Sequence, residues 1–361
     1  MKTFLAAATL VAASTSLTLA GGIDRSGQPV RALFEEGGET GSYVEFSFRS
    51  ISPKASISAL PVDPLKAYSS IGVAVKQQWS EQLSAALIID EPIGAGVDYR
   101  PVFPGFAYVE STSITGLLRY KFDENFSVHG GLRFQDLRGE LQTVVGGVQP
   151  ANVLAGSDMG MGYVIGGAYE RPDIALRVAL TYSSEVDVTL TGSETFLDGA
   201  FVPVVTVPTT FSPSIPASVN LDFQTGIAAD TLLFGSIRYV EWEGFNLTTT
   251  NIGQYVNFRD DATTYTLGLG RRFSDAWSAA VTLGYEAQGT RPGNTLLNPT
   301  TGFKSIGIGA TYTSGNIKVS GGITYAELGD QNFDPNLVLP GGGTFDDNHA
   351  VGAGLRVGFN F

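Results

Sequence analysis

The stretch that decides the fold is the last one, Ala350-Val-Gly-Ala-Gly-Leu-Arg-Val-Gly-Phe-Asn-Phe361. Successive side chains of a β-strand point to opposite faces, so one face here is wholly apolar and the other is small, polar or charged. The apolar face would carry Val351, Ala353, Leu355, Val357, Phe359 and Phe361. A transmembrane β-strand needs about this many residues, apolar toward lipid and polar toward the lumen. We therefore expect the rest of the chain to repeat this unit.

The same alternation extends upstream to Tyr43 and gives about fourteen strands, an even number as in single-chain bacterial barrels. Short turns alternate strictly with long loops. The short turns are 79–82, 122–125, 171–173, 229–230, 274–276 and 313–316, and the long loops are 50–67, 91–112, 136–160, 186–215, 243–262, 288–301 and 329–348. Since every second connection of a barrel lies on the same rim, this sorting predicts an all-β, antiparallel transmembrane β-barrel.

Composition narrows the function. The 361 residues carry a formal net charge of -13, which argues against nucleic acid as a partner because nucleic acid needs a basic face. The absence of Cys removes disulfides and thiolate metal sites. Outside the N-terminus no apolar run reaches the about eighteen residues of a helical membrane span. We expect neither a cofactor nor a bound metal.

The N-terminus divides into two segments. Lys2, an apolar stretch over 4–13 and the small residues Thr18-Leu19-Ala20 predict a secretory signal peptide over 1–20. Residues 21–42 are rich in Gly and charge and show no sustained period. They are either a disordered terminus or a segment folded back into the lumen. The barrel itself is expected over 43–361.

Several short motifs resemble the FadL/TodX family of outer-membrane transporters of long-chain fatty acids and other hydrophobic compounds. They are Pro216-Ala-Ser-Val219, Ala229-Asp230, Trp242, Asp260-Asp-Ala-Thr-Thr-Tyr-Thr-Leu-Gly-Leu269, Arg272-Phe-Ser-Asp-Ala-Trp277, Pro92-Ile-Gly94 and Asp98-Tyr99. The resemblance implies a fourteen-stranded barrel in the bacterial outer membrane, with an N-terminal hatch that plugs it. It also implies that the barrel releases apolar substrate sideways through a kinked strand. Residues 21–42 would be a short hatch. Here Gln28, Pro29 and Phe34 stand in place of the Asn-Pro-Ala that is common in the family.

Three groups of residues are candidates for the transport site. Loops 136–160 and 186–215 are unusually apolar, which indicates a binding groove, unless the two loops only pack on one another over the mouth. The groove residues would be Val144, Val145, Val148, Leu154, Phe196, Leu197, Phe201, Val204, Val205 and Phe211. Inward arginines offer a two-pronged match for a carboxylate, or pair with inward acids and the plug. These are Arg119, Arg133, Arg177 and Arg238. Pro92, Gly94 and Gly96 mark either a lateral gap, as the resemblance implies, or a plain loop start.

The first hypothesis is a passive, gated outer-membrane uptake channel for long-chain fatty acids or other hydrophobic small molecules. Its partners would be that substrate, outer-membrane lipid and lipopolysaccharide, and we expect a monomer. The alternatives are a general diffusion porin and a surface-loop adhesin or phage-receptor barrel. An enzyme is not expected: Ser127 and His129 share one strand face, but no third residue orients them.

Overall fold

The computed structural model describes residues 23–26, 30–57, 61–145, 149–291, 293, 295–333 and 343–361. The predicted signal peptide over 1–20 lies outside these residues, and so do Gln28, Pro29 and Val148. Within the described part of the chain, no helix is both long and apolar enough to cross a membrane.

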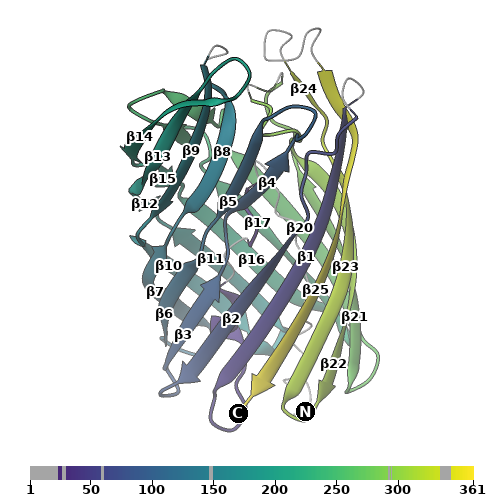
Figure 1. The fold of residues 1–361 in the computed structure, drawn as a ribbon. Helices are drawn as coiled ribbons and strands as arrows, with labels where there is room; N and C mark the ends of the chain where they lie inside the picture. The colour runs from purple at the N-terminus through teal and green to yellow at the C-terminus, as the bar shows by residue number, and fades with distance from the viewer. Residues whose placement is uncertain are drawn as a thin grey trace.

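The chain forms a closed antiparallel barrel of fourteen strands, which confirms the predicted fold class (Figure 1). The main sheet has fifteen strands, of which β24 (Gln331–Phe333) pairs only with β25, and the pairing of β1 with β25 closes the ring. In order around the ring the strands are β1 (Tyr43–Ile57), β2 (Tyr68–Gln78), β3 (Leu83–Asp90), β6 (Ser113–Lys121), β7 (Phe126–Gln135), β10 (Gly160–Arg171), β11 (Leu176–Ser183), β16 (Ser218–Ala228), β17 (Thr231–Val240), β20 (Ala262–Arg272), β21 (Trp277–Glu286), β22 (Phe303–Ser314), β23 (Ile317–Leu328) and β25 (Gly343–Asn360).

The two faces of the barrel wall differ as the alternation predicts. Apolar side chains of the outward parity, such as Phe46, Ile71 and Leu355, remain exposed because they face the surroundings of the barrel. Polar side chains of the other parity, such as Arg119 and Ser127, are buried toward the lumen. The outer surface of the barrel is therefore apolar and its inner surface is polar, as a barrel in lipid requires.

The long connections are not simple loops, and that part of the sequence interpretation is wrong. Several of them fold into a separate six-stranded sheet of order β14-β13-β9-β8-β5-β4, which stands at the end of the barrel opposite the C-terminus (Figure 1). Its strands are β4 (Gly94–Asp98), β5 (Phe106–Glu110), β8 (Arg138–Val145), β9 (Gln149–Ser157), β13 (Leu190–Leu197) and β14 (Pro203–Phe211). We refer to it as the upper sheet.

Two smaller pairs complete this end: β12 (Val186–Asp187) with β15 (Ser214–Ile215), and β18 (Asn246–Thr248) with β19 (Gln254–Asn257). The ranges 50–67 and 329–348 are also partly strand, because β1 and β25 stay paired as far as Ile57 and Phe345. The physical reason is the same throughout. Extended segments side by side satisfy their backbone groups by pairing, even above the membrane.

Two short 3-10 helices are the only other regular elements in the described residues: η3 (Arg31–Phe34) and η4 (Pro172–Ile174). Ala32, Leu33 and Phe34 of η3 are buried in a cluster with lumen-facing residues of the barrel, among them Ala86 and Leu117. A second cluster joins the inner face of the upper sheet to residues of the 243–262 connection. The first cluster lies in the lumen, and the second surrounds the candidate site.

The outward face of β25 gives a direct test of the lipid contact. We expect Leu355→Arg to lower the free energy of unfolding by about 2–4 kcal/mol, since a cation near the bilayer midplane is costly on the lipid face of a barrel. Val351→Arg, on the same face but nearer the strand's upper end, should cost only about 0–1 kcal/mol. Urea unfolding in lipid vesicles measures both, and an equal loss for the two variants would contradict the assignment.

Candidate functional site

A large apolar pocket lies between the upper sheet and the rim of the barrel. It contains about 1440 Å³ of space between its lining atoms, including the solvent-open part of its mouth. Its walls come from segments far apart in the sequence, and most of the lining side chains are apolar. The apolar lining consists of Ile23, Ile93, Ala95, Ala107, Val109, Leu137, Leu141, Val153, Ala155, Leu190, Phe211, Phe245, Leu247, Val256, Phe258, Ala262, Ala287 and Leu297.

Strand alternation explains why the upper sheet can form this wall. Val153 and Ala155 of β9 face the pocket, whereas Leu154 between them is 52% exposed on the opposite face. One face of β9 therefore contributes to the pocket and the core around it, and the other face is exposed. Since apolar pockets with a few polar groups are the usual form of small-molecule sites, this pocket is the candidate site.

The predicted groove residues are distributed differently from the expectation. Only Phe211 lines the pocket. Val145 and Leu197 are buried, and Val204 and Val205 are exposed on β14, away from the pocket lining. Val144, Leu154, Phe196 and Phe201 do not line the pocket either. The apolar residues of loops 136–160 and 186–215 partly form the core on one face of the upper sheet. Composition alone does not distinguish such core residues from ligand-binding residues.

Sequence reasoning missed most of the lining. Phe245 and Leu247 flank Asn246 at β18, and Val256 and Phe258 flank Asn257 at β19, in a range interpreted as a plain loop. Their alternation is a readable signal for a strand with one apolar face. Glu286 and Gln331, which also line the pocket, carry no such signal.

Residues 23–26 run beneath the pocket and add a short strand-like pairing to the upper sheet. The backbone N–H of Arg25 donates to the Pro92 carbonyl at 2.7 Å, and that of Gly94 donates to the Ile23 carbonyl at 2.9 Å. A Cβ at Gly94 would lie 2.3 Å from the Arg25 guanidinium, so a larger residue there would displace this side chain. Two of the three residues predicted as the lateral kink, Pro92 and Gly94, thus hold the N-terminal segment, whereas the Gly96 carbonyl accepts from the Lys66 N–H at 2.9 Å.

A buried ion pair fixes the same segment to the barrel wall. Asp24 is 2% exposed and lies 2.8 Å from Arg238 Nη2, while the Ser26 hydroxyl donates to Asp90 at 2.8 Å. Because a buried ion whose partner is removed is strongly destabilising, Arg238 and Asp24 depend on one another.

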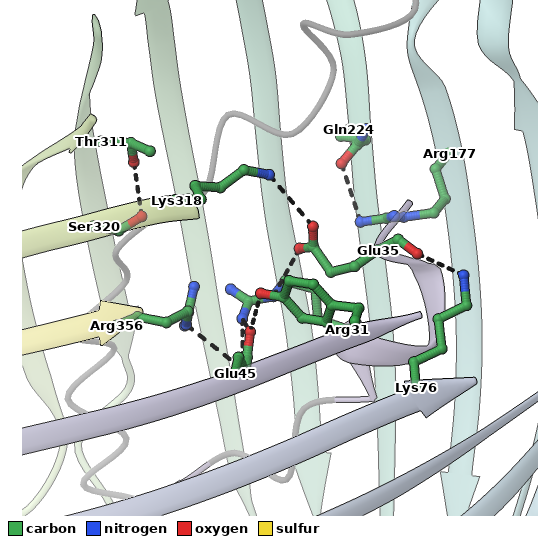
Figure 2. Close-up of polar contacts among 11 residues, drawn as sticks. Arg31, Glu35, Glu45, Lys76, Arg177, Gln224, Thr311, Lys318, Ser320 and Arg356 are labelled. Carbon is green, nitrogen blue, oxygen red and sulfur yellow. Dashed lines mark hydrogen bonds and ion pairs between the residues drawn. The ribbon is translucent and has the colours of Figure 1, made fainter. Parts of the chain in front are cut away.

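Residues 30–35 lie in the lumen below this point, held by charges from several strands (Figure 2). Arg31 donates to Glu45 at 2.9 Å, and Glu45 lies 3.6 Å from Arg356. Lys76 donates to the backbone carbonyl of Glu35 at 2.6 Å. Figure 2 shows Glu45 of β1 and Lys76 of β2 reaching Arg31 and Glu35, with Arg356 of β25 beside Glu45. Residues 30–35 are therefore attached to the barrel wall by charged groups as well as by apolar packing.

The predicted carboxylate-binding arginines all have protein partners. Arg119 donates to Ser127 at 3.1 Å and pairs with Glu170, and Arg177 donates to Gln224 at 3.1 Å. Both guanidinium groups also lie over the Phe34 ring, at 4.4 and 5.0 Å from its centroid. Arg133 contacts the Thr115 hydroxyl at 3.4 Å, and Arg238 pairs with Asp24. None of the four lines the pocket.

One charged cluster stiffens the upper sheet beside the pocket. Arg100 Nε and Nη2 each donate to Asp98 at 2.9 Å, and the Tyr108 hydroxyl donates to the same carboxylate at 2.7 Å. These hydrogen bonds, Arg100 first, hold the pKa of Asp98 well below its usual range. Asp98 therefore stays charged at neutral pH and keeps the β4–β5 hairpin in place.

A closed barrel with part of the N-terminal segment in its lumen and an apolar pocket over one rim is the architecture of an outer-membrane channel for small molecules. A family model for outer membrane protein transport proteins (OMPP1/FadL/TodX) matches residues 65–346. The chain belongs to this family, and it resides in the bacterial outer membrane. The end with the long connections is accordingly the extracellular one.

Solved structures share the fold at low identity. A Pseudomonas aeruginosa FadL homologue has 15% identity and a TM-score of 0.73, over 95% of this chain and 96% of that chain. The Pseudomonas putida toluene transporter TodX has 11% identity and a TM-score of 0.68, over 94% and 97%. The Ralstonia pickettii toluene transporter TbuX has 13% and 0.65, over 91% of each chain. No curated protein matches the chain.

Neighbouring residues of β9 provide a matched test of the pocket. We expect Ala155→Phe to weaken binding of the hydrophobic fluorophore 1-N-phenylnaphthylamine by about tenfold or more, since extra carbons forced into an occupied site cost about 1–3 kcal/mol. Leu154→Phe, on the other face of the same strand, should leave binding unchanged. Fluorescence titration of the purified protein measures both. A weaker affinity for the Leu154 variant alone would move the site to the outer face.

Proposed function

We propose that the protein is a passive, gated channel that admits long-chain fatty acids or other hydrophobic small molecules through the outer membrane. The observation that supports the proposal is the apolar pocket between the upper sheet and the barrel rim, together with residues 32–34, which are buried among lumen-facing residues and would act as the plug. Family membership supports transport, and the lining supports the hydrophobic class. Substrate would enter the pocket from outside and descend its own concentration gradient.

The plug argues against a general diffusion porin. Such a porin needs a wet, continuous lumen, whereas Leu33 and Phe34 are buried at its centre among residues of several strands. Passage therefore requires either movement of the plug or an exit that avoids it. Hatch movement is the gating step in the proposal.

A lateral exit between β2 and β3 fits the backbone pairing. β3 pairs with β2 only between Val73↔Ile89 and Gln78↔Ser84, so residues 68–72 of β2 have no partner in β3. The Ile71 N–H is instead 3.3 Å from the side chain of Glu91. The chain leaves the barrel wall here, immediately before Pro92, Gly94 and Gly96. We propose that this gap is the gate through which substrate reaches the membrane.

The pocket and this gap share one structural element. Ile23 lines the pocket, and the adjacent Asp24 forms an isolated bridge with Ile93 while pairing with Arg238. A ligand that displaced Ile23 would loosen the contacts that cover the gap. Gating in this proposal is thus a competition between ligand and residues 23–26.

The rival functions have weaker support. For a hydrolase, His129 Nε2 would need to face Ser127, but it lies 2.9 Å from the Thr181 hydroxyl, and Ser127 accepts from Arg119. We infer that the protein is not an enzyme. An adhesin or phage-receptor role would use the exposed surface of β14. No other feature of the described residues favours such a role. We further infer a monomer in contact with membrane lipid and lipopolysaccharide, since the closed ring needs no second copy.

Uptake by cells tests the function. Expression in a bacterium that lacks its own outer-membrane hydrophobic channel should increase uptake of a radiolabelled hydrophobic compound, with no increase for a hydrophilic sugar of similar mass. Deletion and complementation in the native host should give the same pattern during growth on hydrophobic carbon sources. A steady, large conductance of the wild type in planar bilayers would instead indicate an open porin.

The Asp24–Arg238 ion pair gives a prediction for gating. We expect Asp24→Ala to raise the frequency of channel openings in planar bilayers, because the variant leaves Arg238 buried without its carboxylate, at a cost of about 3–5 kcal/mol. Asp173→Ala, which removes the exposed Arg171–Asp173 pair at a short turn, serves as the control. Openings as rare as in the wild type would show that this pair does not hold the gate.

A further inference from the structure

The buried end of the pocket carries two acceptor groups that no transport step above uses. Glu286, the last residue of β21, is 4% exposed, and Gln331, the first of β24, is 3% exposed, yet both line the pocket. Glu286 accepts a hydrogen bond from the Thr264 hydroxyl at 2.6 Å. Gln331 Oε1 is buried and has no hydrogen-bond partner in the described residues. Because leaving such an atom without a partner is costly, its place in a pocket wall points to a donor on the ligand.

The charges around the pocket point the same way. The lining includes Arg138 and Arg259, and four acids, Glu140, Asp260, Asp261 and Glu286, so its formal charge is 2 - 4 = -2. Both arginines are exposed: the Arg138 side chain pairs with Glu110 at 3.3 Å, and Arg259 donates to the Thr290 carbonyl at 3.3 Å. No lysine or arginine of the described chain lies within ion-pair distance of Glu286.

We propose that this pocket selects uncharged hydrophobic compounds that carry a hydroxyl group, such as long-chain alcohols or phenols, over carboxylate anions of the same length. The hydrocarbon part would lie against the apolar walls, and the hydroxyl would donate to Glu286 or Gln331 at the buried end. A carboxyl group accepts such a bond in either protonation state. A ligand with a carboxylate would place a second buried negative charge beside Glu286, and no cation there would compensate this charge. The inference rests on the proposed function and names its substrate class.

The test compares three ligands with the same carbon chain. The purified full-length mature protein, in lipid nanodiscs at a pH of about 8 where dodecanoate is ionised, is titrated with 1-dodecanol, dodecane and dodecanoate. Empty nanodiscs give the partitioning correction. We expect dodecanol to bind about tenfold or more tighter than dodecanoate, and about threefold or more tighter than dodecane, as one hydrogen bond allows.

Two variants then assign the selectivity to the buried end. Glu286→Gln keeps an acceptor for Thr264 but removes the acid, so dodecanoate should gain affinity and the dodecanol-to-dodecanoate ratio should fall to about threefold or less. Gln331→Ala should weaken dodecanol binding and leave dodecane unchanged. Asp275→Asn removes an acid from an exposed short turn and should alter none of the affinities. Heat-modified migration on a denaturing gel checks that each variant has formed its barrel.

The outcomes separate this inference from the proposed function. If the wild type binds none of the three ligands, the proposed function itself fails. If it binds dodecanoate as tightly as dodecanol, or if neither variant changes the ratio, the hydroxyl selectivity is wrong while hydrophobic uptake stands. Dodecanoate binding that is lost in Arg259→Gln would place a ligand carboxylate at the exposed rim and overturn the inference in the same way.

Discussion

A chain in lipid has no water to satisfy its backbone, so each N–H and C=O within the membrane must pair inside the protein. The pairing of β1 with β25, from Tyr43↔Asn360 to Ile57↔Phe345, meets this requirement by leaving the ring without an edge. The rest of the structure depends on that closure. Once the ring is closed, the inward side chains enclose a lumen, and the connections between strands must lie at the two rims.

One place where the wall pairs incompletely is also where the N-terminal segment lies. Beyond Val73↔Ile89, β3 and β2 separate, and residues 23–25 provide backbone partners for residues 92–94. A gap in the wall is thus tolerated because another part of the chain covers its edge. In the proposed mechanism the same contacts that satisfy the backbone also close the channel, so stability and gating are coupled through Asp24 and Arg238.

The division between apolar walls and a polar inner end gives the pocket its chemistry. Burial of apolar surface gives affinity for any hydrophobic ligand. The few polar atoms of the pocket distinguish ligands that satisfy their hydrogen bonds from ligands that do not. Glu286, at the end of β21, and Gln331, at the start of β24, both line the pocket, and β24 is held in place by its pairing with β25. The arginines of the lumen, by contrast, are occupied by the N-terminal segment and by neighbouring strands.

Much of the barrel was predictable because its signal is local. Alternation in Val351–Phe361 or Phe46–Phe48 is a property of adjacent residues, and the sorting of short and long connections needs only their order. The upper sheet and the β18–β19 pair were missed since their strands were counted as loops, although Phe245 and Leu247 at β18 carried the same period. For the groove, the sequence identified apolar segments but could not distinguish Ala155, facing the pocket, from Leu154, facing away.

The sequence by itself therefore determined the class of fold, the membrane it belongs to and which side chains of each barrel strand face lipid. Only the tertiary structure decided the pocket, the plug's anchors and the buried acceptors. The physical reason is distance along the chain: Ile23, Val153, Phe211 and Glu286 meet at one site because of the barrel's closure and the register of the upper sheet. No pattern within any single segment encodes that meeting.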